Sequence, residues 1–226
     1  MSTLILLRHG ESIWNAADRF AGWTDVALSD VGEKEAARAG TVLATAGLLP
    51  DVVHTSLLRR AISTADIALD AADRHWISVH RTWRLNERNY GALEGRRRQE
   101  VRARYGDAQF MAWRRAFDVA PPPAERAGDD ARYRALGVAV PGSESLQDVL
   151  VRLLPYWDSA LRADLRRGRT VLVAAHGNVL RVLIAHIEGI PTERLRDIAV
   201  PTGEPLAYEL TADLAAVRRG RLGRPL

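Results

Sequence analysis

The feature that most constrains the fold is an alternation of short apolar runs with helical patterns over the first 80 residues. Three short runs predict strands, and two longer segments between them repeat apolar residues at helical spacing. The predicted strands are Thr3–Leu7, Asp51–His54 and Ile77–His80, and the predicted helices are about Asp30–Ala46 and Leu57–Ala72. This order is typical of a parallel sheet with helices on both faces. The sequence therefore predicts an α/β fold, a three-layer sandwich around a mainly parallel central sheet.

The last third of the chain continues the same pattern. Ser145 is a predicted N-cap for a helix that runs to about Arg166, and Pro155 should bend this helix. The further predicted elements are a strand at Thr170–Ala175, a helix at about Val179–Glu188 and a strand at Leu206–Leu210. The final stretch "RRGRLGRPL" is expected to be disordered. All 226 residues are predicted to form one domain, 1–226.

The middle of the chain differs from both ends because it lacks a strand pattern. Between Trp83 and Gly142 lie an arginine run, a tryptophan beside two arginines and a loop with three prolines. A stretch of this length without a sheet pattern is usually a functional insertion or a lid. We expect a mostly helical and loop insertion at about 94–142.

Composition limits the chemistry. The chain has no cysteine, which excludes disulfides, thiol nucleophiles and thiolate metal sites. The net charge is +4, and Lys34 is the single lysine among the 32 basic residues. A polyanion-binding protein is therefore a remote alternative, although no nucleic-acid motif is present and we expect no nucleic-acid partner. The apolar run at the N-terminus is too short for a signal peptide or a membrane span, so we expect a cytoplasmic protein without membrane contact.

Two of the predicted strands end in the same dipeptide, His-Gly. His9 follows "LILLR" and His176 follows "VLVAA". Since ligands of open parallel sheets bind at the carboxyl ends of the strands, neighbouring strands would place the two imidazoles within a few ångströms of each other. A glycine after each would let the backbone approach a ligand. The alternative for either residue is a structural histidine with satisfied hydrogen bonds.

The residues around these histidines favour phosphoryl transfer over metal chemistry. No H-x-x-x-H or H-x-H spacing occurs, whereas a neutral imidazole can accept a phosphoryl group as a nucleophile. Arg8 and Arg60 would supply the cationic donors, and Arg59 is expected to be solvated. Glu87 is the candidate general acid and base, with a surface ion pair as its alternative role.

Several motifs together resemble a known family. They are "LLRHGESIWN", "RFAGWTDVALSDVG", "HTSLLRRAIST", "TWRLNERNYGALEG", "WRRAFDVAPPP", "AAHGN" and "PTGEPLAYEL". The chain resembles the cofactor-dependent phosphoglycerate mutases of the histidine phosphatase superfamily from residue 4 to about 210. The resemblance implies that His9 is the phosphorylated nucleophile, that Arg8, Arg60 and His176 surround the phosphoryl group, and that Glu87 exchanges a proton with the substrate hydroxyl.

The resemblance also implies the substrate site and its ligands. The predicted substrate-binding residues are Ser12, Asn15, Gly22, Thr24, Arg88, Tyr90, Arg98, Arg114, Arg115, Gly177 and Asn178. It implies priming by 2,3-bisphosphoglycerate, no metal, interconversion of 3-phosphoglycerate and 2-phosphoglycerate in glycolysis and gluconeogenesis, and a homodimer or tetramer.

The chain departs from the family pattern in two places. The family usually carries a lysine where this chain has Arg98, which changes the reach of that cation. The family also has a longer C-terminal tail over the mouth of the site, so a chain ending at Leu226 is expected to have a wetter pocket. A histidine phosphatase acting on small phosphorylated metabolites is therefore the alternative function within the superfamily.

Overall fold

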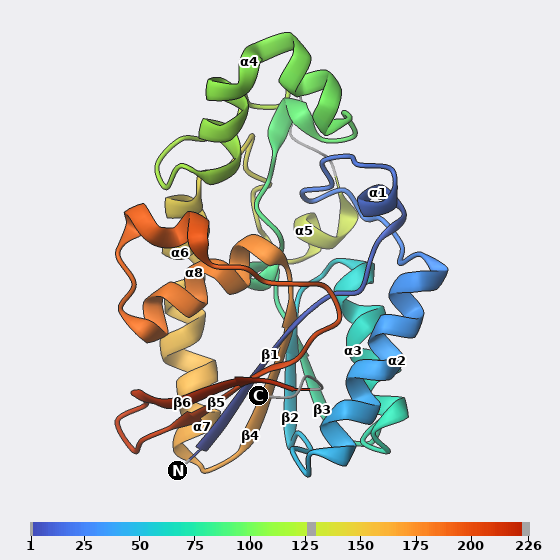
Figure 1. The fold of residues 1–226 in the computed structure, drawn as a ribbon, viewed down its shortest axis with the longest axis vertical. Helices are drawn as coiled ribbons and strands as arrows, with labels where there is room; N and C mark the ends of the chain where they lie inside the picture. Colours follow the sequence, from blue (N-terminus) through green and yellow to red (C-terminus); the bar gives the residue numbers. More distant parts are fainter. Residues whose placement is uncertain (1, 126–129, 223–226) are drawn as a thin grey trace.

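The computed structural model describes residues 2–125 and 130–222, and within them a six-stranded sheet with the order β3-β2-β4-β1-β5-β6 (Figure 1). The strands are β1 (Ser2–Arg8), β2 (Val52–Thr55), β3 (Ser78–Arg81), β4 (Thr170–Ala175), β5 (Leu206–Leu210) and β6 (Ala216–Arg221). The first four strands run parallel, β5 pairs antiparallel with β1, and β6 pairs antiparallel with β5. The predicted α/β fold with a mainly parallel sheet is confirmed.

Helices cover both faces of the sheet, as predicted. One side carries α2 (Asp30–Thr45) and α3 (Arg59–Ala71), and the other carries α6 (Leu146–Tyr156), α7 (Arg162–Arg166) and α8 (Gly177–Glu188) (Figure 1). Strand β1 explains this layering because its side chains alternate between the faces. Leu4 and Leu6 pack into the core under α6 and α8, whereas Ile5 and Leu7 pack into the core under α2 and α3. Full burial of each such side chain stabilises the fold by about 1.5–3 kcal/mol.

The helix predicted from Ser145 to about Arg166 is present and carries an irregularity after Pro155. Ser145 caps α6 through the backbone N–H of Asp148, in a reciprocal capping box. A π-helical turn, Trp157–Leu161, joins α6 to α7 just after the proline. Since proline removes one helical donor, the hydrogen-bond pattern changes locally after Pro155. Trp157 and Leu161 remain buried in the core across this turn.

The C-terminal stretch was predicted wrongly in part. Residues expected to be disordered from Arg218 onward instead continue β6, which pairs with β5 through Glu209↔Arg218 and Tyr208↔Arg219. The edge of the sheet supplies backbone partners whatever the side chains are, and this is why an arginine-rich sequence can still form a strand. The rest of the predicted tail, residues 223–226, lies outside the described residues.

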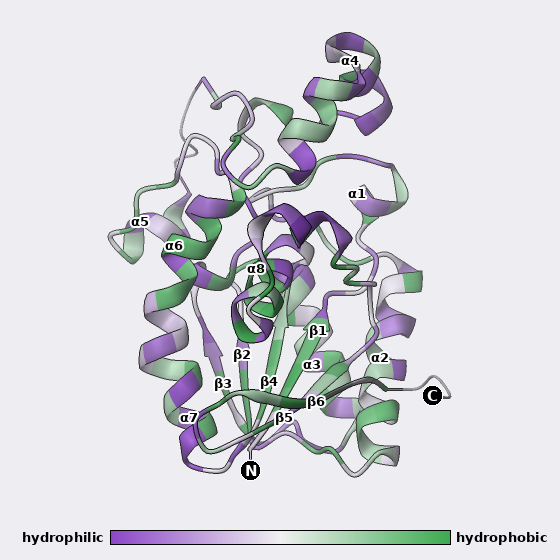
Figure 2. Ribbon diagram, turned by 60° about the vertical axis from the view of Figure 1, so that its left-hand side comes forward, coloured by the Kyte–Doolittle hydropathy of each residue, from purple (hydrophilic) through white to green (hydrophobic). Residues whose placement is uncertain are grey.

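We call residues 94–125 and 130–142, the described part of the predicted insertion, the cap. It contains α4 (Arg98–Arg115) and α5 (Ala131–Ala135), and no strand of the sheet occurs in these residues. Helix α4 lies beyond the end of the sheet (Figure 1) and is far more hydrophilic than the strands (Figure 2). It packs on a small apolar cluster formed by Phe20, Leu93, Val101, Phe110 and Trp113. Helix α4 therefore packs with Phe20 and Leu93, which precede the cap, in an apolar cluster apart from the main core.

The remaining elements are short. They are α1 (Ile13–Ala16), the 3₁₀ turns η1 (Trp83–Leu85) and η2 (Gly91–Leu93), and the 3₁₀ helix η4 (Thr192–Asp197). In the described residues, no helix combines the length and the apolar character that crossing a membrane requires.

Candidate active site

The two His-Gly pairs meet at the carboxyl end of the sheet. Strands β1 and β4 are parallel neighbours with Arg8 opposite Ala175, so His9 and His176 leave their strands side by side. The backbone N–H of His9 donates to the carbonyl of Ala175 at 2.9 Å, and the two rings lie 5.0 Å apart, centroid to centroid, at an angle of 60°. The prediction that the imidazoles lie within a few ångströms of each other is confirmed.

The hydrogen bonds of His9 determine which ring nitrogen is free. Its Nδ1 lies 2.7 Å from the carbonyl oxygen of Gly10, which can only accept, so Nδ1 carries the proton and Nε2 keeps its lone pair. The side chain is 3% exposed, and burial, then the charges of Arg60 and Arg8, lower the pKa of His9 well below its usual value. His9 is therefore neutral near pH 7, with a nucleophilic Nε2.

The glycines that follow the two histidines differ in how much space they have. A Cβ on Gly10 would lie 2.2 Å from the carbonyl oxygen of Gly32, so this glycine lets the loop after β1 pack on the first turn of α2. A Cβ on Gly177 would lie 3.4 Å from Nε of Arg8. Gly10 is therefore required for this packing, and Gly177 lies beside Arg8 at the pocket.

Two guanidinium groups, the fully buried Arg60 and the half-buried Arg8, flank His9 and lack carboxylate partners. Arg60 donates to the carbonyls of Gly22 at 2.7 Å and Thr24 at 3.0 Å, and Arg8 donates to the carbonyl of Val200 at 2.8 Å. In the described residues neither forms an ion pair, and Nε of each is buried without a hydrogen-bond partner. Burial lowers the pKa of Arg60 to about 10. Because an unpaired buried cation is costly, this arrangement favours binding of an anion.

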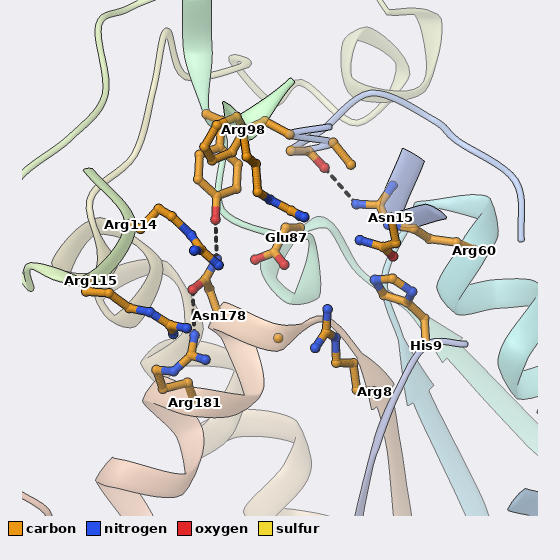
Figure 3. Close-up of a pocket in the computed structure, with 15 residues that line it drawn as sticks. Arg8, His9, Asn15, Arg60, Glu87, Arg98, Arg114, Arg115, Asn178 and Arg181 are labelled. Carbon is orange, nitrogen blue, oxygen red and sulfur yellow. Dashed lines mark hydrogen bonds between the residues drawn. The ribbon is translucent and has the colours of Figure 1, made fainter. Parts of the chain in front are cut away.

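A pocket opens above His9 and gathers most of the predicted residues (Figure 3). The predicted residues that line it are Arg8, His9, Asn15, Gly22, Arg60, Glu87, Tyr90, Arg98, Arg114, Arg115, Gly177 and Asn178. Glu87 lies among the arginines of this pocket (Figure 3), and its Oε1 accepts from the backbone N–H of Arg88 at 2.8 Å. Glu87 forms no ion pair in the described residues, so the structure gives no support to the alternative role in a surface pair.

Hydrogen bonds to the backbone fix the loop that carries Glu87. The indole N–H of Trp23 and the guanidinium of Arg152 both donate to the Glu87 carbonyl, at 2.6 and 3.0 Å. Arg152 also forms a buried ion pair with Glu144 at 2.6 Å, and Glu144 accepts from the backbone N–H of Asn89 at 2.8 Å. These contacts hold the backbone on both sides of Glu87.

Helix α4 reaches the pocket from both of its ends, through Arg98 at its start and Arg114 and Arg115 in its last turn. A straight helix of 18 residues would separate its ends by about 27 Å. Gly106 breaks the helix with a φ of 77°, a left-handed conformation that favours glycine. The break lets the two ends of α4 return to one pocket. Arg98 is additionally paired with Asp18 at 2.8 Å.

Four predicted site residues do not line this pocket. Ser12 caps α1 through the backbone N–H of Asn15, and the Thr24 hydroxyl donates to Glu94 at 2.8 Å. Arg88 is fully buried with its guanidinium 4.5 Å from the centre of the Tyr90 ring. His176 is fully buried beside His9. Ser12, Thr24 and Arg88 therefore lie behind the pocket wall, whereas His176 lies against His9 at the base of the pocket.

The pocket also contains residues that sequence reasoning missed, namely Phe20, Ala21 and Arg181. Arg181 donates to Oδ1 of Asn178 at 2.7 Å, and Nδ2 of Asn178 donates to the Tyr90 hydroxyl at 3.0 Å. Burial, then the charge of Arg115, lowers the pKa of Arg181 to about 10. An arginine one turn after Asn178, inside the otherwise apolar run Val179–Ala185, was the available signal. Arg59, by contrast, is 60% exposed and pairs with Asp25, as expected for a solvated residue.

The described residues hold no group of three or more histidine and carboxylate side chains placed to bind a metal ion. The pocket combines a neutral imidazole, a carboxylate and six guanidinium groups, which come from Arg8, Arg60, Arg98, Arg114, Arg115 and Arg181. Planar guanidinium forks match the oxygen geometry of phosphate and carboxylate. The arrangement is suited to a small, multiply charged anion that undergoes phosphoryl transfer.

Sequence comparisons point to one family. The family model of the histidine phosphatase superfamily, branch 1, matches residues 4–219. A 2,3-bisphosphoglycerate-dependent phosphoglycerate mutase of Nocardia farcinica is 55% identical over 96% of this chain and 89% of its own length. The enzyme of the same name from Thermobifida fusca is 54% identical over 97% of this chain and 92% of its own length.

Comparison with solved structures gives the same fold. A mycobacterial glucosyl-3-phosphoglycerate phosphatase superimposes with a TM-score of 0.77 at 24% identity, covering 98% of this chain and 97% of that chain. An alpha-ribazole phosphatase from Shigella flexneri superimposes with a TM-score of 0.71 at 26% identity, covering 96% of this chain and 94% of that chain.

Proposed function

The chain belongs to branch 1 of the histidine phosphatase superfamily and, within it, to the family of 2,3-bisphosphoglycerate-dependent phosphoglycerate mutases, and we propose that it interconverts 3-phosphoglycerate and 2-phosphoglycerate in glycolysis and gluconeogenesis. One observation carries the proposal beyond the family. His9 and His176 lie 5.0 Å apart next to a pocket whose arginines come from both the sheet and the cap. A mutase needs such a distribution because its ligand carries a second anionic group besides the transferring phosphate.

In the proposed reaction His9 is the nucleophile. The lone pair on Nε2 attacks phosphorus, the N–P bond forms, and the P–O bond to the leaving oxygen breaks. The hydrogen bond from Nδ1 to the Gly10 carbonyl orients the ring and stabilises the charge that develops on it. Arg8 and Arg60 donate to the phosphoryl oxygens, where negative charge accumulates in the transition state.

Glu87 is the proposed proton carrier. Its Oε1 already accepts a backbone hydrogen bond, so Oε2 is the oxygen available to give a proton to the leaving oxygen and to take one from the attacking hydroxyl. The hydrogen bonds from Trp23 and Arg152 to the Glu87 carbonyl fix the Glu87 backbone, which preserves the distance over which the proton moves.

The pocket fits 2,3-bisphosphoglycerate as the priming donor. The unpartnered Nε atoms of Arg8 and Arg60 can serve one phosphate beside His9. Arg98, Arg114 and Arg115 can hold the carboxylate and the second phosphate, together with Asn15, Gly22, Tyr90, Gly177 and Asn178. When bound, this compound supplies the phosphoryl group that first charges His9.

The cap has a proposed role in excluding water. Hydrolysis of phosphohistidine would convert a mutase into a phosphatase, so a mutase must cover the charged histidine during turnover. Helix α4 contributes three of the pocket arginines, and a bound anion would draw its two ends toward the strands. Cytoplasmic location and assembly into a homodimer or tetramer complete the proposal.

The test is incubation with 3-phosphoglycerate and a trace of 2,3-bisphosphoglycerate, with product followed by coupling to enolase. Steady formation of 2-phosphoglycerate without matching release of inorganic phosphate supports the mutase. Stoichiometric phosphate release would instead identify a phosphatase. Binding to duplex DNA with a steep salt dependence, in the absence of turnover, would support the polyanion-binding alternative.

A further inference from the structure

A serine outside the pocket wall contacts the second histidine. Ser56 follows β2, and β4 lies between β2 and β1, so His176 has His9 on one side and Ser56 on the other. The Ser56 hydroxyl oxygen lies 2.8 Å from Nε2 of His176, and both residues are fully buried. Nδ1 of His176 is buried and has no hydrogen-bond partner in the described residues.

The other hydrogen bond of Ser56 restricts the direction of this contact. The backbone N–H of Leu58 donates to the Ser56 oxygen at 3.1 Å. If Nε2 of His176 also donated, the hydroxyl proton of Ser56 and the lone pair on Nδ1 would both be left without partners. If the Ser56 hydroxyl donates to Nε2 instead, a single group is left over, the Nδ1–H of His176. Since buried polar groups are costly when unpaired, the second arrangement is favoured.

Electrostatics limits His176 to one ring proton. Burial, then the charge of Arg60, lowers the pKa of His176 well below its usual value, so the ring is neutral near pH 7. A neutral ring that donates from Nε2 presents a lone pair at Nδ1, which would repel an anion. A neutral ring that accepts at Nε2 presents a donor at Nδ1. The tautomer therefore decides whether His176 can bind a phosphoryl oxygen at all.

We propose that Ser56 is a positioning residue that holds His176 in the Nδ1–H tautomer, so that this N–H donates to the transferring phosphoryl group. The catalytic use of the donor rests on the proposed function, whereas the tautomer itself does not. In this arrangement the two histidines are complementary: each carries its proton on Nδ1, but His9 donates that proton to the Gly10 carbonyl and keeps Nε2 as the nucleophile.

The direct test uses the whole protein labelled with ¹⁵N-histidine and long-range ¹H–¹⁵N correlation spectra near pH 7. The His176 signals are assigned by their loss in His176→Gln. We expect a protonated Nδ1 and an unprotonated Nε2 for His176. The opposite pattern, or a doubly protonated ring, would overturn the proposal without affecting the mutase assignment.

Variants test the consequence for turnover. Ser56→Ala is expected to mix the two tautomers and to lower kcat about tenfold, with KM changed less than twofold, because the lost donor acts mainly in the transition state. Ser56→Thr retains the hydroxyl and should restore both the spectrum and kcat. Thr55→Val is the matched control, since the Thr55 hydroxyl is buried on the adjacent residue and donates to the Ala174 carbonyl.

The two proposals fail differently. Absence of mutase turnover in the wild-type protein would reject the proposed function, and the spectrum would still report the tautomer. A Ser56→Ala protein with wild-type kcat and an unchanged His176 spectrum would reject the positioning role. Circular dichroism melting of each variant verifies that the comparison is made between folded proteins.

Discussion

Helices α8 and α4 both deliver polar side chains to the same pocket, but they are held in opposite ways. Nine of the twelve residues of α8 are buried, whereas three of the eighteen residues of α4 are buried. Helix α8 packs against α6 and β1 in the main core, and α4 packs on the small cluster around Phe110. Since local opening costs less where fewer apolar contacts are lost, α4 should open well before β1, β4 and α8.

The difference separates two tasks. The groups proposed to contact the transferring phosphoryl group, His9, Arg60 and His176, are almost completely buried at the carboxyl end of the sheet. The groups proposed to hold the distal part of the ligand, Arg98, Arg114 and Arg115, are on the helix that has fewer contacts. A rigid base preserves the geometry of the reaction, while a loosely held cap can admit and release ligand.

The largest expected effect comes from a substitution at the carboxyl end of the sheet. His9→Ala should lower mutase activity by at least about 10⁴-fold, because no other group supplies the nucleophile. The variant should also lose acid-labile labelling by 2,3-bisphosphoglycerate, measured with ³²P. Its melting temperature should stay close to that of the wild type. Label that persists in His9→Ala would mean that another residue accepts the phosphoryl group.

Two matched truncations compare the stability of the regions. Leu172→Ala in the core and Phe110→Ala in the cap cluster each remove a buried side chain at a cost of about 2–5 kcal/mol. Leu172→Ala should lower the global melting temperature. Phe110→Ala should mainly speed amide exchange in α4, with little change in β1 and β4. If both variants reduce the melting temperature equally, the cap is not an independent opening unit.

Acid should weaken the sheet region before the cap. The Nε2–H of His54 donates to the Asp164 carboxylate at 3.0 Å, and Nδ1 accepts from the Tyr156 hydroxyl at 2.7 Å. Burial, opposed in part by the Asp164 hydrogen bond, lowers the pKa of His54 from 6.5 to about 4. Between pH 6.5 and pH 4 the unfolded chain binds a proton at His54 that the folded protein does not, so the free energy of unfolding decreases as the pH is lowered. The loss is about 3 kcal/mol by pH 4. Above pH 6.5 this histidine contributes no pH dependence.

Urea unfolding at a series of pH values checks this prediction. His54→Gln should flatten the dependence between pH 6.5 and 4, and the remaining slope should come in part from His9 and His176, whose pKa values are also lowered. The cap contains no histidine. An unchanged slope in His54→Gln would remove His54 from the account.

The smallest expected effect comes from the cap. Arg115→Ala should raise the KM for 3-phosphoglycerate about 10- to 100-fold with a smaller change in kcat, as expected for loss of a charged hydrogen bond to the distal part of the ligand. Arg104→Ala is the matched control on the same helix, because Arg104 is exposed and does not line the pocket. Equal effects of the two substitutions would indicate a general electrostatic field in place of a specific contact.

Local sequence patterns were sufficient where one element decides the outcome. The apolar run of β1 predicted a strand buried on both faces, and the His-Gly pairs predicted the edge at which His9 and His176 meet. Local patterns were insufficient where a strand forms only because it pairs with a neighbouring strand. Strand β6 has an arginine-rich sequence and exists because β5 offers an unpaired edge. No periodicity could have indicated it.

The sequence by itself determined the layered α/β fold, the two histidines at the strand ends and most of the arginines around them, because these follow from periodicity and chain order. Only the tertiary structure decided which groups reach the pocket. It brought Arg181 into the wall, left Ser12, Thr24 and Arg88 behind it, and placed Ser56 against His176. The physical reason is that the tautomer of a histidine and the orientation of an arginine side chain depend on their hydrogen-bond partners. These partners are remote along the chain and become neighbours only when the sheet and the helices pack.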